Sequence, residues 1–150
     1  MTVTIRTGDP RDRQATALLT ASHALMQELF PAESNHFLSI DALCSPDIHF
    51  FVAWHDGEIK GCAALAERAD YGEIKSMFVA PTARGLGIGE LLMAHLVRHG
   101  ADLKLPCLRL ETGDTLHAAH RLYERAGFVR RGAFGDYPDD PISIFMEKPV

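Results

Sequence analysis

Three glycines within five residues, at positions 85, 87 and 89, are the feature that most constrains the fold of this chain. They follow Arg84 and separate a strand-forming run that ends at Pro81 from an amphipathic segment that begins at Ile88. Glycine allows positive φ values and a close approach of the backbone to a ligand, and the first amides of a helix have no acceptor within the helix. The helix dipole adds positive potential there, and Arg84 adds a cation suited to phosphate oxygens. The turn Arg84–Gly89 therefore predicts a site for a phosphate or pyrophosphate group.

Two better-known phosphate loops do not fit this turn. A Walker A loop has lysine and then serine or threonine after its last glycine, whereas Gly89 is followed by Glu90. A dinucleotide fingerprint starting at Gly85 would need glycine at position 90. A Rossmann domain would also open with alternating strands and helices, whereas three successive strands precede this turn. The spacing therefore excludes both loops.

The periodicity of the remaining sequence predicts one α+β, or mixed α/β, domain over residues 1–150. The pair Asp9-Pro10 marks the start of the first helix, and Asp56-Gly57 marks a hairpin turn. Helical spacing of apolar residues predicts helices over 15–29, 88–99 and 116–126 and a short one over 38–43. Alternation and turn residues predict strands over 3–6, 48–55, 58–67, 73–80, 107–111, 128–131 and 142–147.

The composition excludes several classes of partner. Apolar residues make up 47% of the chain and charged residues 23%, which is ordinary for a globular protein. The net charge of −5 gives no basis for binding nucleic acid, and no apolar run approaches the roughly 18–20 residues of a membrane span. Residues 1–10 lack the apolar stretch of a secretory signal. Cys44, Cys62 and Cys107 form no C-x-x-C pair, which favours buried reduced thiols. We expect a cytoplasmic protein with no nucleic acid and no membrane as partner. The sequence is compatible with a homodimer and does not decide the oligomeric state.

Two separate motifs resemble those of the GNAT superfamily of N-acetyltransferases. The family's signature for acetyl-CoA, Gln/Arg-x-x-Gly-x-Gly/Ala, is matched in full by Arg84–Gly89. Its later element, Leu-Tyr-x-x-x-Gly-Phe, is matched by Leu122–Phe128. The chain is similar to small bacterial members whose substrate is unassigned. The resemblance implies a GNAT-like fold, with a central, mostly antiparallel mixed sheet of about seven strands flanked by helices.

The resemblance also implies contacts with acetyl-CoA. The amides of the glycine turn would hold the pyrophosphate, and the backbone of residues 77–79 would bond the pantetheine arm beside a strand pair that splays apart. Tyr123 would face the thioester sulfur, while Leu116 stands where many members have an asparagine that contacts pantetheine. The residues that we assign to the cofactor are Met77, Phe78, Val79, Arg84, Gly85, Leu86, Gly87, Ile88, Gly89, Ala119 and Tyr123.

Acyl transfer to an amine requires a neutral amine and a stabilised leaving thiolate. An alkylamine with a pKa near 10.4 needs about 4–5 kcal/mol to lose its proton at pH 7, so a base is expected. Glu73 stands where several family members carry a catalytic glutamate, although it could equally pair with Lys75 across the strand. Glu111, at the end of the next strand, is the rival base or an anchor for the substrate amine. Tyr123, with a phenol pKa near 10, would stabilise the departing sulfur by a hydrogen bond rather than by full proton transfer.

The sequence thus predicts direct transfer of an acetyl group from acetyl-CoA to a primary amine. The acceptor is a small-molecule amine or a protein amine, and its identity stays open. The alternative is a sensor or partner module that binds CoA or acyl-CoA without turnover. The pairs His95/His99 and His117/His120 could each share a helix face, but His-Glu-x-x-His is absent and we expect no metal.

Overall fold

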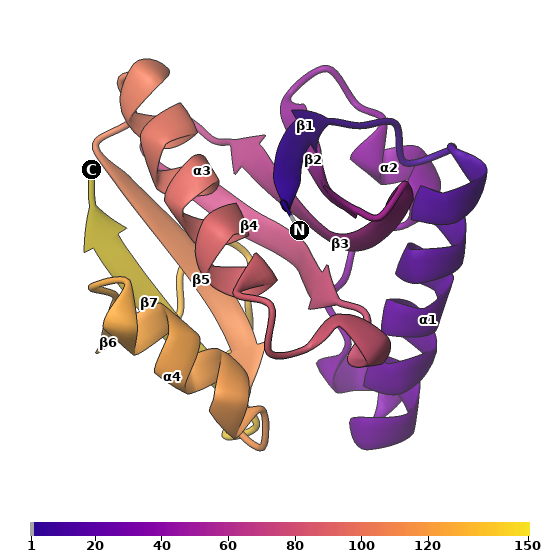
Figure 1. Cartoon of the computed structure of the whole chain (residues 1–150). Coiled ribbons are helices and arrows are strands. Elements are labelled where there is room, and N and C mark those ends of the chain that lie inside the picture. The colour runs from indigo at the N-terminus through magenta and orange to yellow at the C-terminus, as the bar shows by residue number, and fades with distance from the viewer. Residues whose placement is uncertain (1) are drawn as a thin grey trace.

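A seven-stranded sheet forms the centre of the molecule, in the strand order β1-β2-β3-β4-β5-β7-β6 (Figure 1). The computed structural model describes residues 2–150. Neighbouring strands are antiparallel except β4 and β5, which are parallel. The predicted α+β fold with a mostly antiparallel mixed sheet is therefore confirmed. The strands are β1 (Thr4–Thr7), β2 (Ile48–His55), β3 (Glu58–Glu67), β4 (Gly72–Val79), β5 (Cys107–Gly113), β6 (Val129–Arg131) and β7 (Ser143–Pro149).

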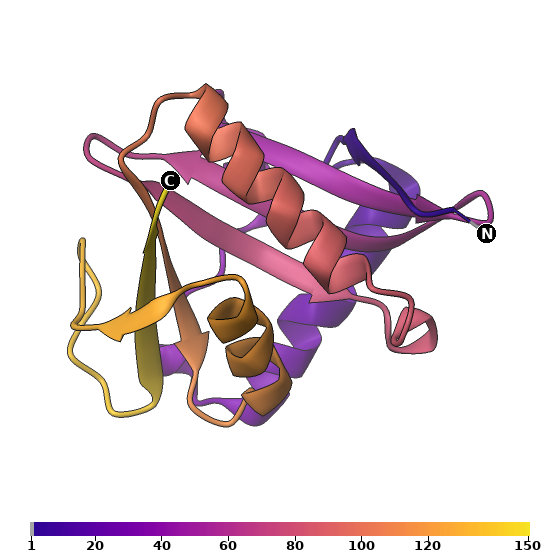
Figure 2. The ribbon, with the colours of Figure 1, turned by 60° about the vertical axis from the view of Figure 1, so that its left-hand side comes forward.

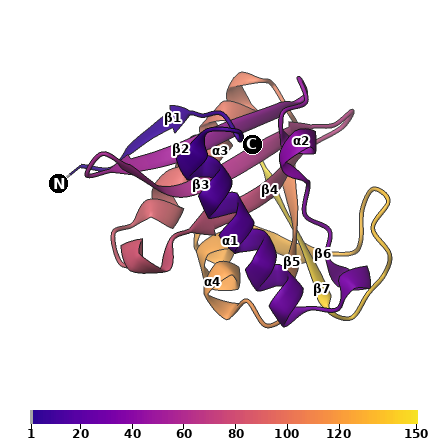
Figure 3. The ribbon, with the colours of Figure 1, turned by 90° about the vertical axis from the view of Figure 1, so that its right-hand side faces the viewer.

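Helices cover both faces of this sheet. The helix α1 crosses one face (Figure 3), and α3 and α4 lie on the other (Figure 2). Within residues 2–150, no helix combines the length and the hydrophobicity needed to cross a membrane. The α-helices are α1 (Arg13–Leu29), α2 (Ile40–Leu43), α3 (Ile88–Asp102) and α4 (His117–Arg125), and two short 3-10 helices are η1 (Ala32–Ser34) and η2 (Pro81–Ala83).

The central strands are buried on both faces, because helices cover both faces of the sheet. Successive side chains of a strand point to opposite sides, so each of these strands contributes to both cores. In β2, Phe50 and Val52 pack in the core beneath α1, whereas Phe51 and Ala53 pack in the core beneath α3. The sheet therefore separates two hydrophobic cores. Alternate residues of a strand therefore pack against α1 on one face and against α3 on the other.

A bulge in β4 shifts this alternation by one residue, so that the side chains after it point to the opposite face from the one otherwise expected. The pairing of β4 with β3 shifts register between Cys62 and Ala64, and Ser76 on the opposite strand has a φ of 55°. An inserted residue of this kind moves the following side chains to the other face. Met77 accordingly packs on the α3 side and Phe78 on the α1 side.

The parallel strands β4 and β5 part soon after they meet. Their only pairs within the described chain are Gly72 with Leu108 and Glu73 with Arg109. Figure 2 shows the two strands diverging from there, so the sheet is open between them. This is the splayed strand pair that the resemblance implies.

The first helix begins later than Asp9-Pro10 predicts. Asp12 is the N-cap, and its carboxylate accepts hydrogen bonds from the amides of Gln14 and Ala15. Asp9 instead closes the preceding turn, where its Oδ1 accepts from the amide of Arg11 at 2.9 Å. Two capping residues three apart compete for the same role, and the one followed by unbroken helical residues takes it.

The prediction for the cysteines holds for one of the three. Cys62 is fully buried, but Cys44 and Cys107 are partly exposed, and all three thiols are free. Cys107 lies near the edge formed by β7, where its thiol contacts Glu147 at 3.6 Å. An apolar neighbourhood in the sequence therefore did not ensure burial at the strand start.

Candidate active site

A cavity of about 150 Å³ occupies the opening between β4 and β5. Residues 74–78 of β4 and 110–113 of β5 form its sides. Because the opening passes through the sheet, both helix layers contribute: α4 lines one side, and α1 with residues 34–37 lines the other. The cavity thus connects the face that carries the glycine turn with the face covered by α1.

The glycine turn leads into α3 as predicted. Gly85 has a φ of 87°, and Gly87, the N-cap of α3, has a φ of 75°. A Cβ at either position would meet nothing within 4 Å, so the backbone conformation, not close packing, explains these glycines. The first helical hydrogen bond joins the amide of Leu91 to the carbonyl of Gly87 at 3.1 Å. The amides before Leu91 precede the helical ladder, which leaves them suited to an anion.

The end of β4 presents a free edge toward the opening. On the β3 side, Phe78 and Val79 pair with Cys62 and Gly61. On the β5 side, no strand pair follows Glu73 in the described chain. The backbone there can bond an extended ligand, which fits the role that the resemblance gives to residues 77–79.

Tyr123 enters the cavity from α4. Its side chain is buried, with 7% of its surface exposed, and it packs against Phe128. Burial, with a smaller contribution from the charge of Glu111, raises the pKa of Tyr123 to about 12. The hydroxyl therefore stays protonated over the physiological range and acts as a hydrogen-bond donor.

Glu111 enters the cavity from the other side of the sheet. Its neighbour Leu110 packs in the core beneath α3 and α4, so Glu111 points toward α1. One carboxylate oxygen accepts a hydrogen bond from the hydroxyl of Ser143 at 2.8 Å. Burial raises the pKa of Glu111, against the smaller opposing effect of the Ser143 bond. A carboxyl group with a raised pKa is suited to accept a proton near neutral pH.

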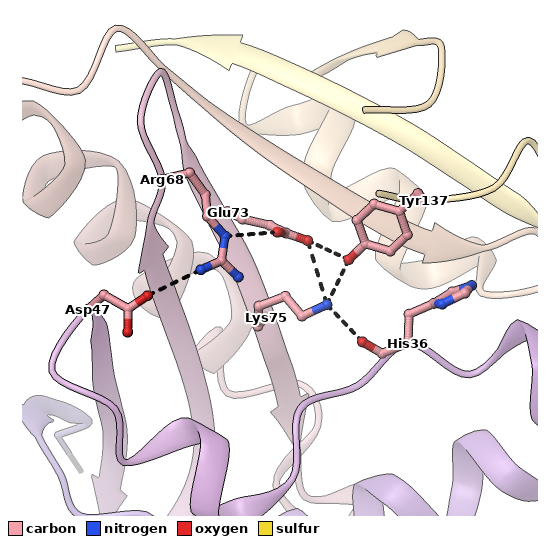
Figure 4. Close-up of polar contacts among 6 residues, drawn as sticks. All are labelled: His36, Asp47, Arg68, Glu73, Lys75 and Tyr137. Carbon is pink, nitrogen blue, oxygen red and sulfur yellow. Dashed lines mark hydrogen bonds and ion pairs between the residues drawn. The ribbon is translucent and has the colours of Figure 1, made fainter. Parts of the chain in front are cut away.

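Glu73 is surrounded by partners of its own (Figure 4). Its side chain is 5% exposed, and Oε2 lies 3.5 Å from the ammonium of Lys75. The hydroxyl of Tyr137 donates to the same oxygen, and burial and the charge of Glu73 raise the pKa of Tyr137. Lys75 also donates to the Tyr137 hydroxyl at 2.7 Å and to the carbonyl of His36 at 2.9 Å. The network joins β4 to two segments far away in sequence.

A second cation completes the surroundings of Glu73. Arg68 lies 3.6 Å from Oε1 of Glu73 and 3.2 Å from Asp47 (Figure 4). Glu73 lines a separate hollow with Arg68 and Tyr137, not the cavity between the strands. The predicted pairing of Glu73 with Lys75 is thus present in the structure.

The structure brings five of the predicted site residues together in the cavity, whereas Glu73, Val79 and the turn Arg84–Gly89 do not line it. Glu111 and Tyr123 share the cavity, and Leu116 lies in its wall where the family often has asparagine. Three further residues assigned to the cofactor, Met77, Phe78 and Ala119, also line it.

Tyr137 and Ser143 were not anticipated from the sequence. Tyr137 lies within the turn-rich stretch 135–141 and Ser143 follows it, and no local pattern relates either residue to β4 or β5. A polar residue that follows a turn at the start of a strand, as Ser143 does, was the only signal.

The histidines on α3 form a core contact. The rings of His95 and His99 each meet Phe51 edge-on. His99 Nε2 is 3.2 Å from His49 Nδ1, and His49 Nε2 is 2.8 Å from Glu67. The shared helix face that the spacing predicts is therefore turned toward the sheet.

The second pair lies at the start of α4. The rings of His117 and His120 are perpendicular, with centroids 5.6 Å apart, and His120 Nε2 is 2.7 Å from the carbonyl of Gly113. Within residues 2–150, no group of three or more histidine, cysteine, aspartate or glutamate side chains is arranged to hold a metal ion.

Comparison with known proteins gives consistent matches over most of the chain. The profile of the acetyltransferase (GNAT) family matches residues 16–128. A protein of Azospirillum brasilense named IAA acetyltransferase is 42% identical over 150 residues, covering 99% of this chain and 98% of its own. The uncharacterised N-acetyltransferase YsnE of Bacillus subtilis (strain 168) is 35% identical and covers 97% of this chain and 99% of its own. A solved Klebsiella pneumoniae structure, provisionally described as an acyl-CoA N-acyltransferase, has a TM-score of 0.82 at 34% identity, covering 98% of this chain and 97% of its own. These matches show that the chain belongs to the acetyltransferase (GNAT) family and is an acyltransferase.

Proposed function

We propose that this protein transfers the acetyl group of acetyl-CoA directly to the primary amine of a small molecule. The observation that carries the proposal is the cavity through the split sheet, which Tyr123 enters from the α4 face and Glu111 from the α1 face. A thioester that arrives along the glycine turn and an amine that arrives beneath α1 would meet between these two groups.

The turn and the strand edge offer backbone groups that coenzyme A could bind. Positive φ values at Gly85 and Gly87, with open space around both, leave the amides at the start of α3 accessible to phosphate oxygens. The unpaired edge of β4 offers backbone donors and acceptors to the amides of a pantetheine arm. The description of the Klebsiella relative as an acyl-CoA N-acyltransferase supports a CoA thioester as the donor.

Glu111 is better placed than Glu73 to deprotonate the amine. Glu73 is buried and Glu111 is partly buried. Glu111 accepts a bond only from the neutral Ser143 hydroxyl, whereas Glu73 faces Lys75 and Arg68. Glu73 is also bonded by the Tyr137 hydroxyl and lines a separate hollow, so it does not face the place where the amine would meet the thioester. Glu111, with its raised pKa, would take the proton from the ammonium form of the substrate, and the free lone pair would then attack the thioester carbonyl.

Tyr123 would stabilise the sulfur that leaves. A thiol has an ordinary pKa near 8.5, well below that of Tyr123 at about 12. The phenol therefore donates a hydrogen bond to the developing thiolate and keeps its own proton.

The cavity's composition supports direct transfer, without an acyl-enzyme. No cysteine is among the described residues that line it, and burial raises the pKa of Cys62 to about 12, which disfavours a thiolate nucleophile. The relatives named IAA acetyltransferase and N-acetyltransferase support the acetyl group and nitrogen chemistry. Nothing in the site favours a binding module without turnover.

An acceptor screen that measures CoA release tests this proposal. We expect release to depend on a primary amine and the product amine to carry the acetyl group by mass spectrometry. If acetyl-CoA bound but no amine accelerated release, the proposal would fail. A stable acetyl-cysteine after incubation with acetyl-CoA alone would contradict direct transfer.

A further inference from the structure

The α1 side of the cavity carries three large apolar side chains beside the polar residues Ser22, Ser34, Asn35 and His36. Phe30, at the C-terminal end of α1, and Phe37, from the segment after η1, lie in its wall together with Met26. Phe30 is 8% exposed, and the ring of Phe37 stacks on His23 with centroids 4.1 Å apart. Both rings are thereby fixed in position, and they offer aromatic surface to whatever occupies this side.

Phe30 is held next to Glu111 by a glycine. Gly113 follows Glu111 by two residues on β5, so both face α1. A Cβ at Gly113 would lie 2.2 Å from Cζ of the Phe30 ring, a distance that no side chain tolerates. Only glycine lets the ring sit on the strand beside the carboxylate. An apolar surface and a single acid are thus adjacent.

The two charged side chains of the lining, Lys75 and Glu111, differ in how many polar partners they already have. Among the described residues that line the cavity, Glu111 is the only carboxylate and Lys75 the only lysine or arginine. The ammonium of Lys75 has three donors, and it has three partners: the carbonyl of His36, the hydroxyl of Tyr137 and the carboxylate of Glu73. Glu111 accepts only from Ser143. A substrate ammonium therefore finds an available carboxylate, whereas the one lysine of the lining has no spare donor for a substrate carboxylate.

The volume sets an upper limit on the buried part of the acceptor. The cavity measures about 150 Å³, the size of an apolar protein cavity that holds one benzene molecule. The acetyl end of acetyl-CoA shares this space, so one six-membered ring, or an aliphatic group of that size, is the most that the acceptor can bury in it. A second ammonium, as in a polyamine, would find no second carboxylate among the described residues of the lining.

We propose that the acceptor is a primary monoamine with one aromatic ring or a comparable apolar body and without a carboxylate. The amine lies at Glu111, and the body lies against Phe30 and Phe37. This inference rests on the proposed function, because it assigns the substrate class of the same site.

The decisive comparison uses 2-phenylethylamine and L-phenylalanine, which differ only in the carboxylate. Burying a charge without a partner lowers affinity by about 100-fold or more, so we expect kcat/KM to favour 2-phenylethylamine by at least that factor. Equal or better use of L-phenylalanine would overturn the inference and leave acetyl transfer intact. Preference for spermidine over 2-phenylethylamine would overturn it too.

Binding measured without turnover separates this inference from the proposed function. Calorimetry with the protein saturated with CoA should detect 2-phenylethylamine and little or no L-phenylalanine. If that preference appeared but no acetylated product formed, the ligand class would stand and the acetyltransferase proposal would fail. If neither compound bound, the inference would be wrong.

Variants of the Phe30 contact supply a second test. Gly113→Ala forces the ring off the strand, so we expect a loss of preference for 2-phenylethylamine with acetyl-CoA affinity unchanged. Phe30→Leu, which keeps an apolar side chain, should lower kcat/KM for the aromatic amine relative to n-butylamine. Val129→Ala serves as the control, since Val129 is 64% exposed on β6. An unchanged ratio of aromatic to aliphatic amine in both variants would contradict the assignment of the ring site.

Discussion

Glu73 and Glu111 project from neighbouring strands toward the same face of the sheet, and they differ in their partners. Lys75, Arg68 and the Tyr137 hydroxyl surround Glu73, whereas Glu111 has the Ser143 hydroxyl alone. Both glutamates were candidate bases from the sequence, because it shows only the spacing of residues along each strand. It does not show contacts between residues far apart in the chain, such as Tyr137 and Glu73, which are 64 positions apart. Only the lysine two positions away signalled the pairing of Glu73.

Replacing Glu111 by glutamine should separate activity from stability. We expect kcat to fall by about 10²–10⁴-fold, the usual span for a general base. The pKa of Glu111 is raised in the folded state by burial, so its contribution to stability is present below the unfolded pKa near 4.3 and is lost as pH rises through the folded pKa. Glu111→Gln should therefore raise the melting temperature at pH 7, and this gain should disappear near pH 4. Kinetics and calorimetry on the same variant measure both effects.

Glu73→Gln is the matched comparison for that variant. It leaves Lys75, whose side chain is 9% exposed, without its counter-ion, so it should lower the melting temperature at pH 7. Its effect on kcat should be much smaller than that of Glu111→Gln. The reverse ranking of the two kcat values would restore Glu73 as the base.

Tyr123→Phe tests the hydroxyl and keeps the packing of the ring. A single well-placed donor to a developing charge is worth about 10²-fold or more in kcat, and we expect that loss with unchanged affinity for acetyl-CoA. Because the pKa of Tyr123 is raised to about 12, the wild-type rate should show no loss from deprotonation of this group below pH 10. Unchanged kcat, measured where chemistry limits the rate, would leave Tyr123 with a packing role against Phe128.

At the scale of elements, the site depends on how β4 ends. Its bulge at Ser76 moves Met77 to the α3 face and Phe78 to the α1 face. Its pairing with β5 stops after Glu73. Hydrophobic alternation predicted the strand over 73–80 and could not predict either feature. A bulge leaves no composition signal when the inserted residue is a serine rather than a glycine. The splayed pair was expected only because two motifs resembled those of a family.

The glycine turn allows a controlled test of the cofactor site. Gly87→Ala places a Cβ at a φ of 75°, which costs about 1–2 kcal/mol of folding free energy. It also displaces the first amides of α3, and each lost bond to a charged group costs about 1.5–3 kcal/mol, roughly 10- to 100-fold in affinity. We expect acetyl-CoA binding, followed by calorimetry, to weaken by that factor.

Gly57→Ala is the control for strain at that position. Gly57 has a φ of 74° and equally open space around it, but it lies in the hairpin between β2 and β3. Both variants should lose similar stability, and only Gly87→Ala should lose affinity. Equal affinities in the two proteins would place the phosphate site elsewhere.

At the scale of the whole molecule, the cavity gathers segments that the chain separates widely. Residues 22–37, two central strands, the start of α4 and the loop before β7 meet around it. The sequence predicted nearly every helix and strand, since periodicity is local. It could not predict which side chains beneath α1 face the cavity, because residues 34–37 follow no regular pattern and the loop at 134–141 is held by a hydrogen bond from Ser34 to Asp140 at 2.6 Å. Contacts of this kind depend on the folded sheet that brings their two ends together.

A chain of polar contacts also ties α3 to the sheet. Glu67 on β3, His49 on β2 and His99 on α3 follow one another at 2.8 and 3.2 Å. Burial, with a smaller effect of His49, lowers the pKa of His99, and burial lowers the pKa of His95 as well. Both rings pack on Phe51, so their charge state affects the core beneath α3.

The stability of the whole domain should therefore fall in mild acid. A histidine whose folded pKa is lowered contributes stability above its unfolded pKa, near 6.5, and this stability is lost as pH falls through the folded pKa. We expect the free energy of unfolding, measured with urea, to decrease from pH 7.5 to pH 5 in the wild-type protein. His99→Gln, which cannot gain the proton, should show a smaller decrease, whereas His117→Gln, at an exposed position on α4, should follow the wild type. If His99→Gln lost as much free energy as the wild type over this range, the acid sensitivity would arise from other groups.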